Sequence, residues 1–331
     1  MTDKKKNVRA IGLCSGGLDS ILAGLVLKEQ GIDVTWICFE TPFFPADKAR
    51  KASEMTGIPL IVREITDTYL EMLTDPPCGY GKHMNPCRDC HALMFRLAGQ
   101  VMIEEGFHFL FSGEVAGQRP LSQNKQAMRY VEKRSGFDGK VLRPLSARVL
   151  PETEMETEGL VDRERLLAIQ GRSRKEQMAL AEAYGITEYP SPAGGCLLTD
   201  QKYSDRLRDL FGNGKAYASS DLHLLKQGRH LRLATGEKVI IGRTQGDNRW
   251  IIKYHDPARH LLIDLKAKGS PTVLVDVDAT EETVQLGASL CAGYAKVPVG
   301  EVVEAVVKGE TGQRVIAVAS VDPAAYRECI I

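Results

Sequence analysis

The sequence predicts an α/β protein in which a parallel sheet, with helices on both faces, precedes a second, smaller α+β domain. Three observations lead to this prediction. Strand-like and helix-like segments alternate from residue 8 to about residue 112, as they do in parallel sheets. Short β-like runs dominate beyond residue 220. The length of 331 residues is about that of two domains.

The elements of the first domain follow from hydrophobic periodicity. Apolar and β-branched runs predict strands, at residues 8–14, 33–40, 60–65 and 107–111. Apolar positions at helical spacing predict helices, at residues 20–30, 46–56 and 90–105. Because ligands of such sheets bind at the carboxyl ends of the strands, functional residues are expected directly after each strand.

The second domain is expected to begin after a loop at residues 212–220. This loop separates a predicted domain at 1–211 from one at 221–331. Strands are predicted at residues 230–233, 238–241, 250–254, 261–265, 272–277 and 314–318. A helix is predicted at 281–295.

The composition limits the classes of function. The chain has 43 Lys and Arg against 43 Asp and Glu, which excludes a globally basic nucleic-acid binder but not a local basic face. No apolar stretch approaches the ~18 residues of a membrane span, and the run after the N-terminal lysines is too short for a signal peptide. The eight cysteines are irregularly spaced and form no disulfide framework. We therefore expect a cytoplasmic protein with no membrane partner.

The strongest motif is Ser15-Gly16-Gly17-Leu18-Asp19-Ser20, which follows a predicted strand and opens a predicted helix. Two glycines let the backbone turn tightly and approach a ligand. The free N–H groups at the helix start, together with the helix dipole, favour an anion. Asp19 would either cap the helix or hold a metal ion beside phosphate. A simple strand-to-helix turn is the alternative, but the complete string favours phosphate binding.

Other nucleotide motifs are missing from the sequence. The chain contains no Gly-x-x-x-x-Gly-Lys-Ser/Thr, and no Gly-x-Gly-x-x-Gly follows a strand. These observations argue against P-loop NTPases and against dinucleotide oxidoreductases.

The string from Ser15 to Ser20 resembles the PP-loop of ATP pyrophosphatases, a superfamily with a Rossmann-like, adenine nucleotide alpha hydrolase-like fold. Residues 112–118, 122–123 and 142–145 resemble the corresponding region of the tRNA 4-thiouridine synthase family. The resemblance implies ATP and Mg²⁺ as cofactors. It implies nucleotide contacts from Ser15, Gly16, Gly17, Asp19, Ser20, Phe39, Gly113 and Gln123, with Asp19 also catalytic.

The cysteines form a second set of candidate residues. Cys87 and Cys90 make a Cys-x-x-Cys, and Cys196 lies far along the chain. This arrangement resembles the tRNA 2-thiouridylases, where such cysteines either hold a [4Fe–4S] cluster or act as a catalytic pair. The first reading makes Cys87, Cys90 and Cys196 metal ligands. In the second, Cys196 carries a persulfide and Cys87 resolves the disulfide. A zinc site with Cys78, His83 or His91 as fourth ligand and simple buried thiols are the alternatives.

A basic block at residues 119–148 is the first candidate RNA contact. Its eight cations face only Glu132 and Asp138, which favours a track for a phosphate backbone. A solvated helix face is the alternative. The candidate RNA contacts in and near the block are Arg119, Lys125, Arg129, Lys133, Arg134, Arg143 and Arg172.

The second candidate RNA contact lies in the C-terminal domain. Residues 228–233 and 239–248 resemble the RNA-binding NFACT-R domain. The resemblance implies phosphate contacts from Arg229, His230, Arg232, Arg243 and Arg249, with Trp250 as a face for stacking. Charged hairpin loops without RNA are the alternative.

Together these features predict an ATP-dependent tRNA sulfurtransferase. A uridine carbonyl oxygen would be adenylated and sulfur would then displace AMP. The expected partners are tRNA, a cysteine desulfurase or other sulfur donor, and a second copy of the chain in a homodimer. A PP-loop enzyme acting on a small molecule and a non-enzymatic RNA-binding protein are the competing hypotheses.

Overall fold

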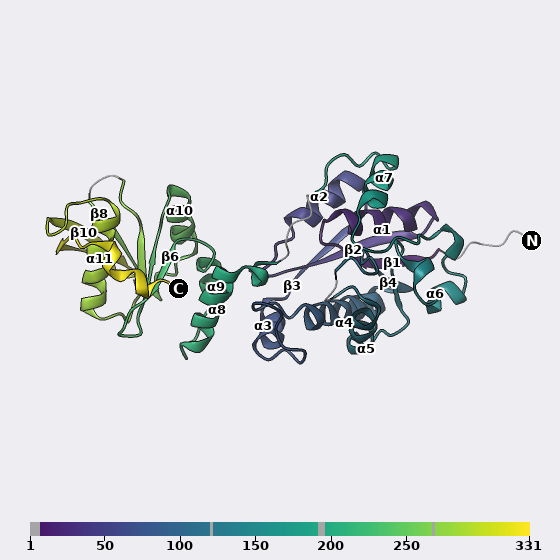
Figure 1. Cartoon of the computed structure of the whole chain (residues 1–331), viewed down its shortest axis with the longest axis horizontal. Helices are drawn as coiled ribbons and strands as arrows, with labels where there is room; N and C mark the ends of the chain where they lie inside the picture. Colours follow the sequence, from purple (N-terminus) through teal and green to yellow (C-terminus); the bar gives the residue numbers. More distant parts are fainter. Residues whose placement is uncertain (1–6, 120–121, 191–195, 267–268) are drawn as a thin grey trace, which may run out of the picture. The chain divides into compact units, whose positions relative to one another are not determined.

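A computed structural model describes residues 7–119, 122–190, 196–266 and 269–331 (Figure 1). The chain divides into two compact units, Met1–Thr199 and Asp200–Ile331. Each unit has its own sheet. Within the described ranges, no helix has the length and apolar character needed to cross a bilayer.

The first unit is built on a five-stranded sheet in which every strand pair is parallel, in the order β3-β2-β1-β4-β5. Its strands are β1 (Arg9–Leu13), β2 (Asp33–Glu40), β3 (Leu60–Glu64), β4 (Phe109–Ser112) and β5 (Val141–Leu142). The predicted parallel sheet is confirmed. From β1 the chain moves outward through β2 to β3 and then returns to place β4 on the other side of β1. The gap between the carboxyl ends of β1 and β4 is therefore the switch point where such sheets bind ligands.

Helices cover both faces of this sheet. They are α1 (Leu18–Glu29), α2 (Asp47–Thr56), α3 (Thr66–Thr74), α4 (Cys87–Glu105), α5 (Lys125–Ser135), α6 (Glu154–Thr157) and α7 (Lys175–Ala183). Helices α1, α2 and α7 lie on one face, and α3, α4 and α5 on the other (Figure 1). Trp36 of β2 is fully buried under α1. A Cβ on Gly24 of α1 would lie 2.8 Å from the Trp36 indole nitrogen, so glycine is what lets α1 approach the sheet closely.

The second unit contains a six-stranded antiparallel sheet in the order β11-β10-β8-β9-β7-β6. Its strands are β6 (Arg229–Arg232), β7 (Lys238–Ile241), β8 (His260–Leu265), β9 (Val273–Asp276), β10 (Val302–Gly309) and β11 (Gly312–Ala319). Its helices are α8 (Gln201–Gly212), α9 (Ser219–Leu224), α10 (Gln245–Tyr254) and α11 (Glu281–Tyr294), followed by the 3₁₀ segment η4 (Pro323–Cys329). The predicted α+β character of this part is confirmed.

The second sheet has a hydrophobic core on each face, because successive side chains of a strand point to opposite faces of the sheet. Val239 and Ile241 of β7 join a core with α11. Ile240, between them, joins a core with Leu224 of α9 and Ile251 of α10. Helices α9 and α10 therefore lie on the sheet face opposite to α11.

The prediction of a strand at residues 250–254 is wrong, because this segment lies in helix α10. The aromatic and β-branched residues favour a strand locally. However, the Thr244 hydroxyl accepts the Asp247 N–H at 3.1 Å and caps a helix start. Burial of Ile251 then fixes the helix against the sheet.

The two units divide between Thr199 and Asp200, ahead of the predicted linker at 212–220. Helix α8 accounts for the difference, because it packs within the second unit. The Tyr203 hydroxyl donates to the Leu222 carbonyl at 3.1 Å. The Arg206 guanidinium donates to the carbonyls of Leu225 and Gly228 at 2.8 and 3.1 Å.

Candidate nucleotide and thiol sites

The loop from Ser15 to Ser20 leaves β1 at the switch point and enters α1. Gly17 is the residue before α1, and no described side chain caps this helix start. The N–H groups of the first turn are therefore available to an anion. Gly16 has φ +69°, and a Cβ there would collide with the backbone of Lys48 in α2. Only glycine lets the loop turn at this point.

Gly113 lies beside this loop, as the strand order requires. It follows β4, and a Cβ on it would collide with the backbone of Asp19 and Ser20. The structure thus brings together the two segments that the sequence placed after the first and fourth strands. Gln123 is tied to the same region, because its carbonyl accepts the Gly117 N–H at 2.7 Å. Phe39 is buried near the carboxyl end of β2, the strand beside β1.

Several polar atoms around Asp19 are buried and lack a hydrogen-bond partner among the described residues. They are Asp19 Oδ1, Gln177 Oε1 and Arg174 Nε, and Gln123 Oε1 in the loop after β4 is also buried without a partner. Burial raises the pKa of Asp19, and this effect is opposed by hydrogen bonds from Gln118 and Gln177 and by the charges of Arg174 and Arg119. Buried polar atoms without partners are costly. The unpartnered carboxylate and amide oxygens are acceptors and fit a cation or hydrogen-bond donors, while Arg174 Nε and the N–H groups at the start of α1 fit an anion such as phosphate. The site therefore suits a phosphate group together with a cation.

The sequence did not predict three residues of this nucleotide site, namely Gln118, Arg174 and Gln177. Gln118 lies in the segment 112–118, but nothing in the sequence of that segment indicates that its side chain reaches Asp19. Gln177 comes from α7, far along the chain, and only the fold brings it to the loop.

The three candidate cysteines lie close together in the first unit. Cys87 and Cys90 occupy the first turn of α4, and Cys196 directly precedes the 3₁₀ segment Leu197–Thr199. Burial raises the pKa of Cys90, and the neighbouring Cys196 and Cys87 raise it further. Burial also raises the pKa of Cys196 to about 12, with a further contribution from Cys87. The thiols are thus close enough to influence one another's pKa.

The hydrogen bonds around the thiols are few. The Tyr69 hydroxyl bonds to Cys90, Asn85 Nδ2 donates to Cys87 Sγ at 3.3 Å, and the Leu198 N–H donates to Cys196 Sγ at 3.4 Å. Across the described ranges, no group of three or more His, Cys, Asp or Glu side chains is arranged to hold a metal ion. Of the residues considered as a fourth zinc ligand, His91 is engaged with Glu114 instead.

A buried charge network lies between the thiols and the loop after β4. Glu114 follows Gly113, and its carboxylate accepts from Arg143 Nε at 3.0 Å. Arg143 also pairs with Glu132. The guanidinium of Arg143 holds the pKa of Glu114 at about 2 against the effect of burial.

Arg143 is therefore not an RNA contact, contrary to its place in the predicted basic block. Its side chain is only 4% exposed, and two carboxylates bind it within the fold. The sequence could not show this, because Glu114 is 29 residues away from it in the chain.

The other cations of the basic block differ in their partners. Lys125, Lys133 and Arg134 of α5 are exposed, as are Arg119 and Arg172. Arg129 pairs with Asp138 and Glu132. The basic block thus has an exposed basic surface, but this surface includes fewer unpaired cations than the eight in the sequence.

His230 is fully buried and bonds to the Gln227 carbonyl at 2.9 Å, so the structure contradicts its predicted phosphate contact. Three of the four arginines assigned to RNA in the second unit already have partners. Arg232 forms a bidentate pair with Asp209, at 2.8 and 2.7 Å. Arg243 pairs with Asp247 at 2.9 Å, and the Arg229 guanidinium lies 4.3 Å from the Tyr294 ring centre. Pairing with carboxylates neutralises Arg232 and Arg243, which weakens the prediction that they contact phosphates.

The first unit is thus an α/β unit with an anion-binding loop at its switch point, formed by residues 15–20 and the start of α1 and here called the anion cradle. In the chain it is followed by an α+β unit. Comparison with known proteins then identifies relatives. Residues 228–329 match the family model described as NFACT protein RNA binding domain. A tRNA-specific 2-thiouridylase MnmA of Desulforamulus reducens is 22% identical over 280 residues, 72% of this chain and 72% of that protein.

A probable tRNA sulfurtransferase of Lactobacillus helveticus is 30% identical over 132 residues, 36% of this chain and 30% of that protein. A solved 4-thiouridine synthetase–RNA complex with bound ATP is similar over 55% of this chain and 54% of that chain, with 21% identity and a TM-score of 0.36. The named relatives and the family-model match confirm the resemblances to tRNA-thiolating enzymes and to the NFACT-R domain that were stated from the sequence.

Proposed function

We propose that this chain is an ATP-dependent tRNA sulfurtransferase that thiolates a uridine base. One observation carries the proposal: a single unit combines an anion cradle at its switch point with three neighbouring thiols. The relatives named as tRNA 2-thiouridylase and tRNA sulfurtransferase support the same activity.

The loop and its neighbours would bind the nucleotide. The N–H groups at the start of α1 and the exposed hydroxyl of Ser15 are suited to phosphate oxygens. The predicted Ser20 contact would come from its position in the first turn, because its hydroxyl donates to the Gly17 carbonyl at 2.8 Å. Asp19 would hold Mg²⁺, which neutralises phosphate charge when bound. The buried unpartnered atoms of Gln123 and Gln177 would gain partners in the complex.

In the first step a uridine carbonyl oxygen attacks the α-phosphorus of ATP and pyrophosphate leaves. The start of α1 stabilises the charge that develops on the departing phosphates. Arg119 and Arg174, whose charges already act on Asp19, would stabilise it further. The carbonyl oxygen is then bonded to AMP, a good leaving group.

In the second step sulfur replaces that oxygen. In the route through a cysteine pair, the terminal sulfur of a Cys196 persulfide attacks the activated carbon and AMP departs. The Cys87 thiolate then attacks the Cys196 sulfur, which breaks the S–S bond, leaves sulfur on uridine and forms a Cys87–Cys196 disulfide. A cysteine desulfurase would supply the persulfide sulfur, and an external thiol would reduce the disulfide.

The alternative route uses the thiols as ligands. Cys87, Cys90 and Cys196 would hold a [4Fe–4S] cluster, which supplies an open iron site for sulfide when it is bound. Burial raises the pKa of Cys90 and Cys196, so both thiols are protonated at neutral pH in the metal-free protein. Loading a cluster would therefore release protons.

The substrate would be held by cations of the first unit and by the second unit. Exposed Lys125, Lys133 and Arg134 form a basic surface on α5, and the match to an RNA-binding family covers residues 228–329. A cytoplasmic location would give the enzyme access to tRNA and to a desulfurase.

The deciding experiment is mass spectrometry of tRNA nucleosides from a strain that lacks this chain, with and without complementation. Loss of one thiolated uridine, restored by the wild type but not by Asp19→Ala, is expected. Unchanged nucleosides, together with pyrophosphate release that does not need RNA, would overturn the proposal in favour of a small-molecule substrate.

A further inference from the structure

Helices α9 and α10 place three aromatic rings together, here called the aromatic cluster: His223, Trp250 and Tyr254. Trp250 and Tyr254 are four residues apart and so share one face of α10. The His223 and Tyr254 rings stack with centres 4.2 Å apart and planes 12° apart. The Trp250 and Tyr254 ring centres are 4.6 Å apart. Trp250 Nε1 donates to the His223 carbonyl at 2.8 Å, which fixes the indole in place.

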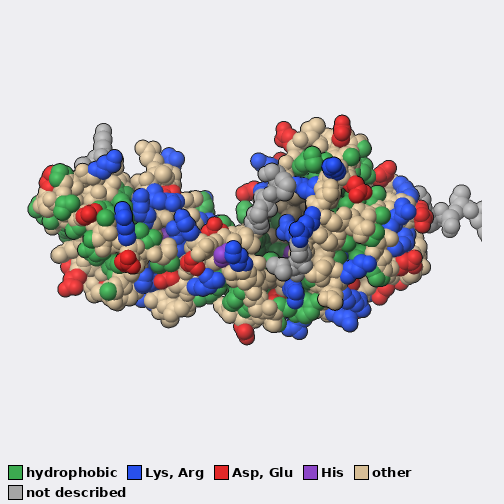
Figure 2. Space-filling model, viewed as in Figure 1, with side chains coloured by type: hydrophobic (Ala, Val, Ile, Leu, Met, Phe, Trp, Pro, Cys, Tyr) green, Lys and Arg blue, Asp and Glu red, His purple; other side chains and the backbone are tan. Residues whose placement is uncertain are grey.

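The cluster is accessible and carries positive charge. All three rings are half-buried, and Lys253 and Arg249 beside them are exposed. The Lys226 ammonium lies 5.6 Å from the Trp250 ring centre, and the Lys253 ammonium lies 4.9 Å from that of Tyr254. Lys and Arg side chains gather over the part of this unit where Figure 1 places α10 (Figure 2).

These lysines lack carboxylate partners within the described residues. Burial and the charge of Lys253 lower the pKa of Lys226. Burial and both lysines lower the pKa of His223 to about 4, so this ring is neutral at neutral pH and stacks without a charge. The cluster therefore has two cations that gain stability from an added anion.

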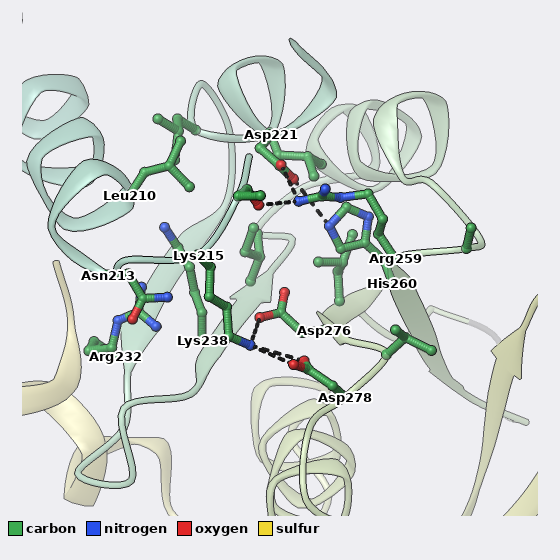
Figure 3. Close-up of a pocket in the computed structure, with 17 residues that line it drawn as sticks. Leu210, Asn213, Lys215, Asp221, Arg232, Lys238, Arg259, His260, Asp276 and Asp278 are labelled. Carbon is green, nitrogen blue, oxygen red and sulfur yellow. Dashed lines mark hydrogen bonds and ion pairs between the residues drawn. The ribbon is translucent and has the colours of Figure 1, made fainter. Parts of the chain in front are cut away.

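Other cationic sites of the unit differ in this respect. A cavity of about 380 Å³ is lined by Lys215, Arg259 and acidic residues (Figure 3). Lys215 bonds to Asp276 and Asp278 at 3.1 and 3.0 Å, and Arg259 bonds to Asp221 at 2.9 Å. Arg232 and Lys238 also line this cavity and pair with Asp209. The cations that line it are thus neutralised within the fold, as is Arg243.

We propose that the α9–α10 face binds an unpaired stretch of RNA, with a base stacked on the aromatic cluster and the adjoining phosphates on Lys226 and Lys253. This inference rests on RNA being the substrate class in the proposed function. Aromatic faces accept any base by stacking, and lysines provide the backbone contacts. On binding, the ammonium groups would exchange the ring faces for phosphate oxygens.

The test is binding of a fluorescein-labelled single-stranded 12-nucleotide RNA to the full chain, measured by fluorescence anisotropy across a salt series. Trp250→Leu should weaken binding at least fivefold, within the range for loss of a stacking aromatic. Trp250→Phe keeps a ring and should retain most of the affinity. Lys253→Glu should weaken binding and flatten the log–log salt slope by about 0.7 for each lost contact.

Arg327→Glu is the matched control, because Arg327 is exposed in η4, which packs with α11 on the other face of the sheet. It should change affinity by less than twofold. Thermal unfolding checks that the variants fold. Because Lys253 is exposed, Lys253→Glu tests RNA binding without disturbing the packing around Trp250. Wild-type affinity in both Trp250→Leu and Lys253→Glu would overturn the inference while leaving RNA binding intact. Failure of the wild type to bind either this RNA or tRNA would overturn the RNA substrate as well.

Discussion

His91 Nδ1 lies 2.9 Å from Glu114 Oε1. His91 follows Cys90 on α4, and Glu114 follows Gly113 at the switch point. This one bond therefore links the helix that carries two of the thiols to the segment that packs against the anion cradle. The Arg143 guanidinium donates to the other oxygen of the same carboxylate, Oε2, at 3.0 Å.

Replacing Glu114 should destabilise the first unit strongly. Glu114→Gln leaves the buried Arg143 charge with only Glu132, and breaking a buried pair in this way costs about 3 kcal/mol or more. Urea unfolding would measure the loss. Glu304→Gln is the control, because Glu304 forms an exposed pair with Lys266 and should cost under about 1 kcal/mol. Equal, small losses in both variants would contradict the assignment.

The same pair predicts how stability depends on acid. The pKa of Glu114 is about 2 in the folded protein against 4.5 in an ordinary carboxyl. A carboxyl with a depressed folded pKa stabilises the native state above the unfolded pKa and loses that contribution as the pH falls. The free-energy difference between wild type and Glu114→Gln should be constant above pH 4.5 and shrink towards pH 2. A difference that does not change across this range would be evidence against the buried pair.

Asp19→Ala should abolish ATP binding without loss of stability. Burial raises the pKa of Asp19 and Oδ1 has no partner in the described structure, so this carboxylate costs folding free energy. We expect unchanged or higher thermal stability together with loss of nucleotide affinity by calorimetry. Asp47→Ala, at the exposed start of α2, should leave ATP affinity unaltered. Undiminished affinity in Asp19→Ala would exclude the loop as the nucleotide site.

Substitution of the three thiols can distinguish a [4Fe–4S] cluster from a catalytic cysteine pair. Protein purified without oxygen should carry about four irons per chain if the cluster route holds, and serine at Cys87, Cys90 or Cys196 should each remove the iron. Cys291→Ser, at a buried thiol of the second unit, is the control. Iron-free protein that still thiolates tRNA and requires only Cys87 and Cys196 would select the cysteine-pair route instead.

The division between Thr199 and Asp200 predicts the behaviour of truncated chains. Residues 1–199 should bind ATP and remain monodisperse. Residues 1–220 should aggregate more readily, because α8 would lose the partners of Tyr203, Arg206 and Leu207, which are buried in the whole protein. Size-exclusion chromatography compares the two fragments. A well-behaved 1–220 fragment would place α8 with the first unit.

Sequence reasoning succeeded where local pattern and topology agree. Residues 33–40 form a strand as predicted, and the alternation of elements was enough to place Gly113 beside the Ser15–Ser20 loop. It failed where partners are distant in the chain. Nothing near Arg143 or Arg232 reveals the carboxylates that bind them, and the helical state of Trp250 depends on a cap and on burial of Ile251. Side-chain contacts across the fold, rather than element order, account for most of what was missed.

Helix α8 begins with its own cap, since the Asp200 carboxylate accepts the Tyr203 N–H at 2.8 Å. The residue that caps the N-terminus of this helix therefore belongs to the second unit, and no residue before Asp200 is needed to cap it. A gene fusion at Thr199–Asp200 would transfer an intact module and leave Cys196 with the first unit. Such a junction gives recombination a way to exchange the carboxyl-terminal module between enzymes without disturbing the thiols.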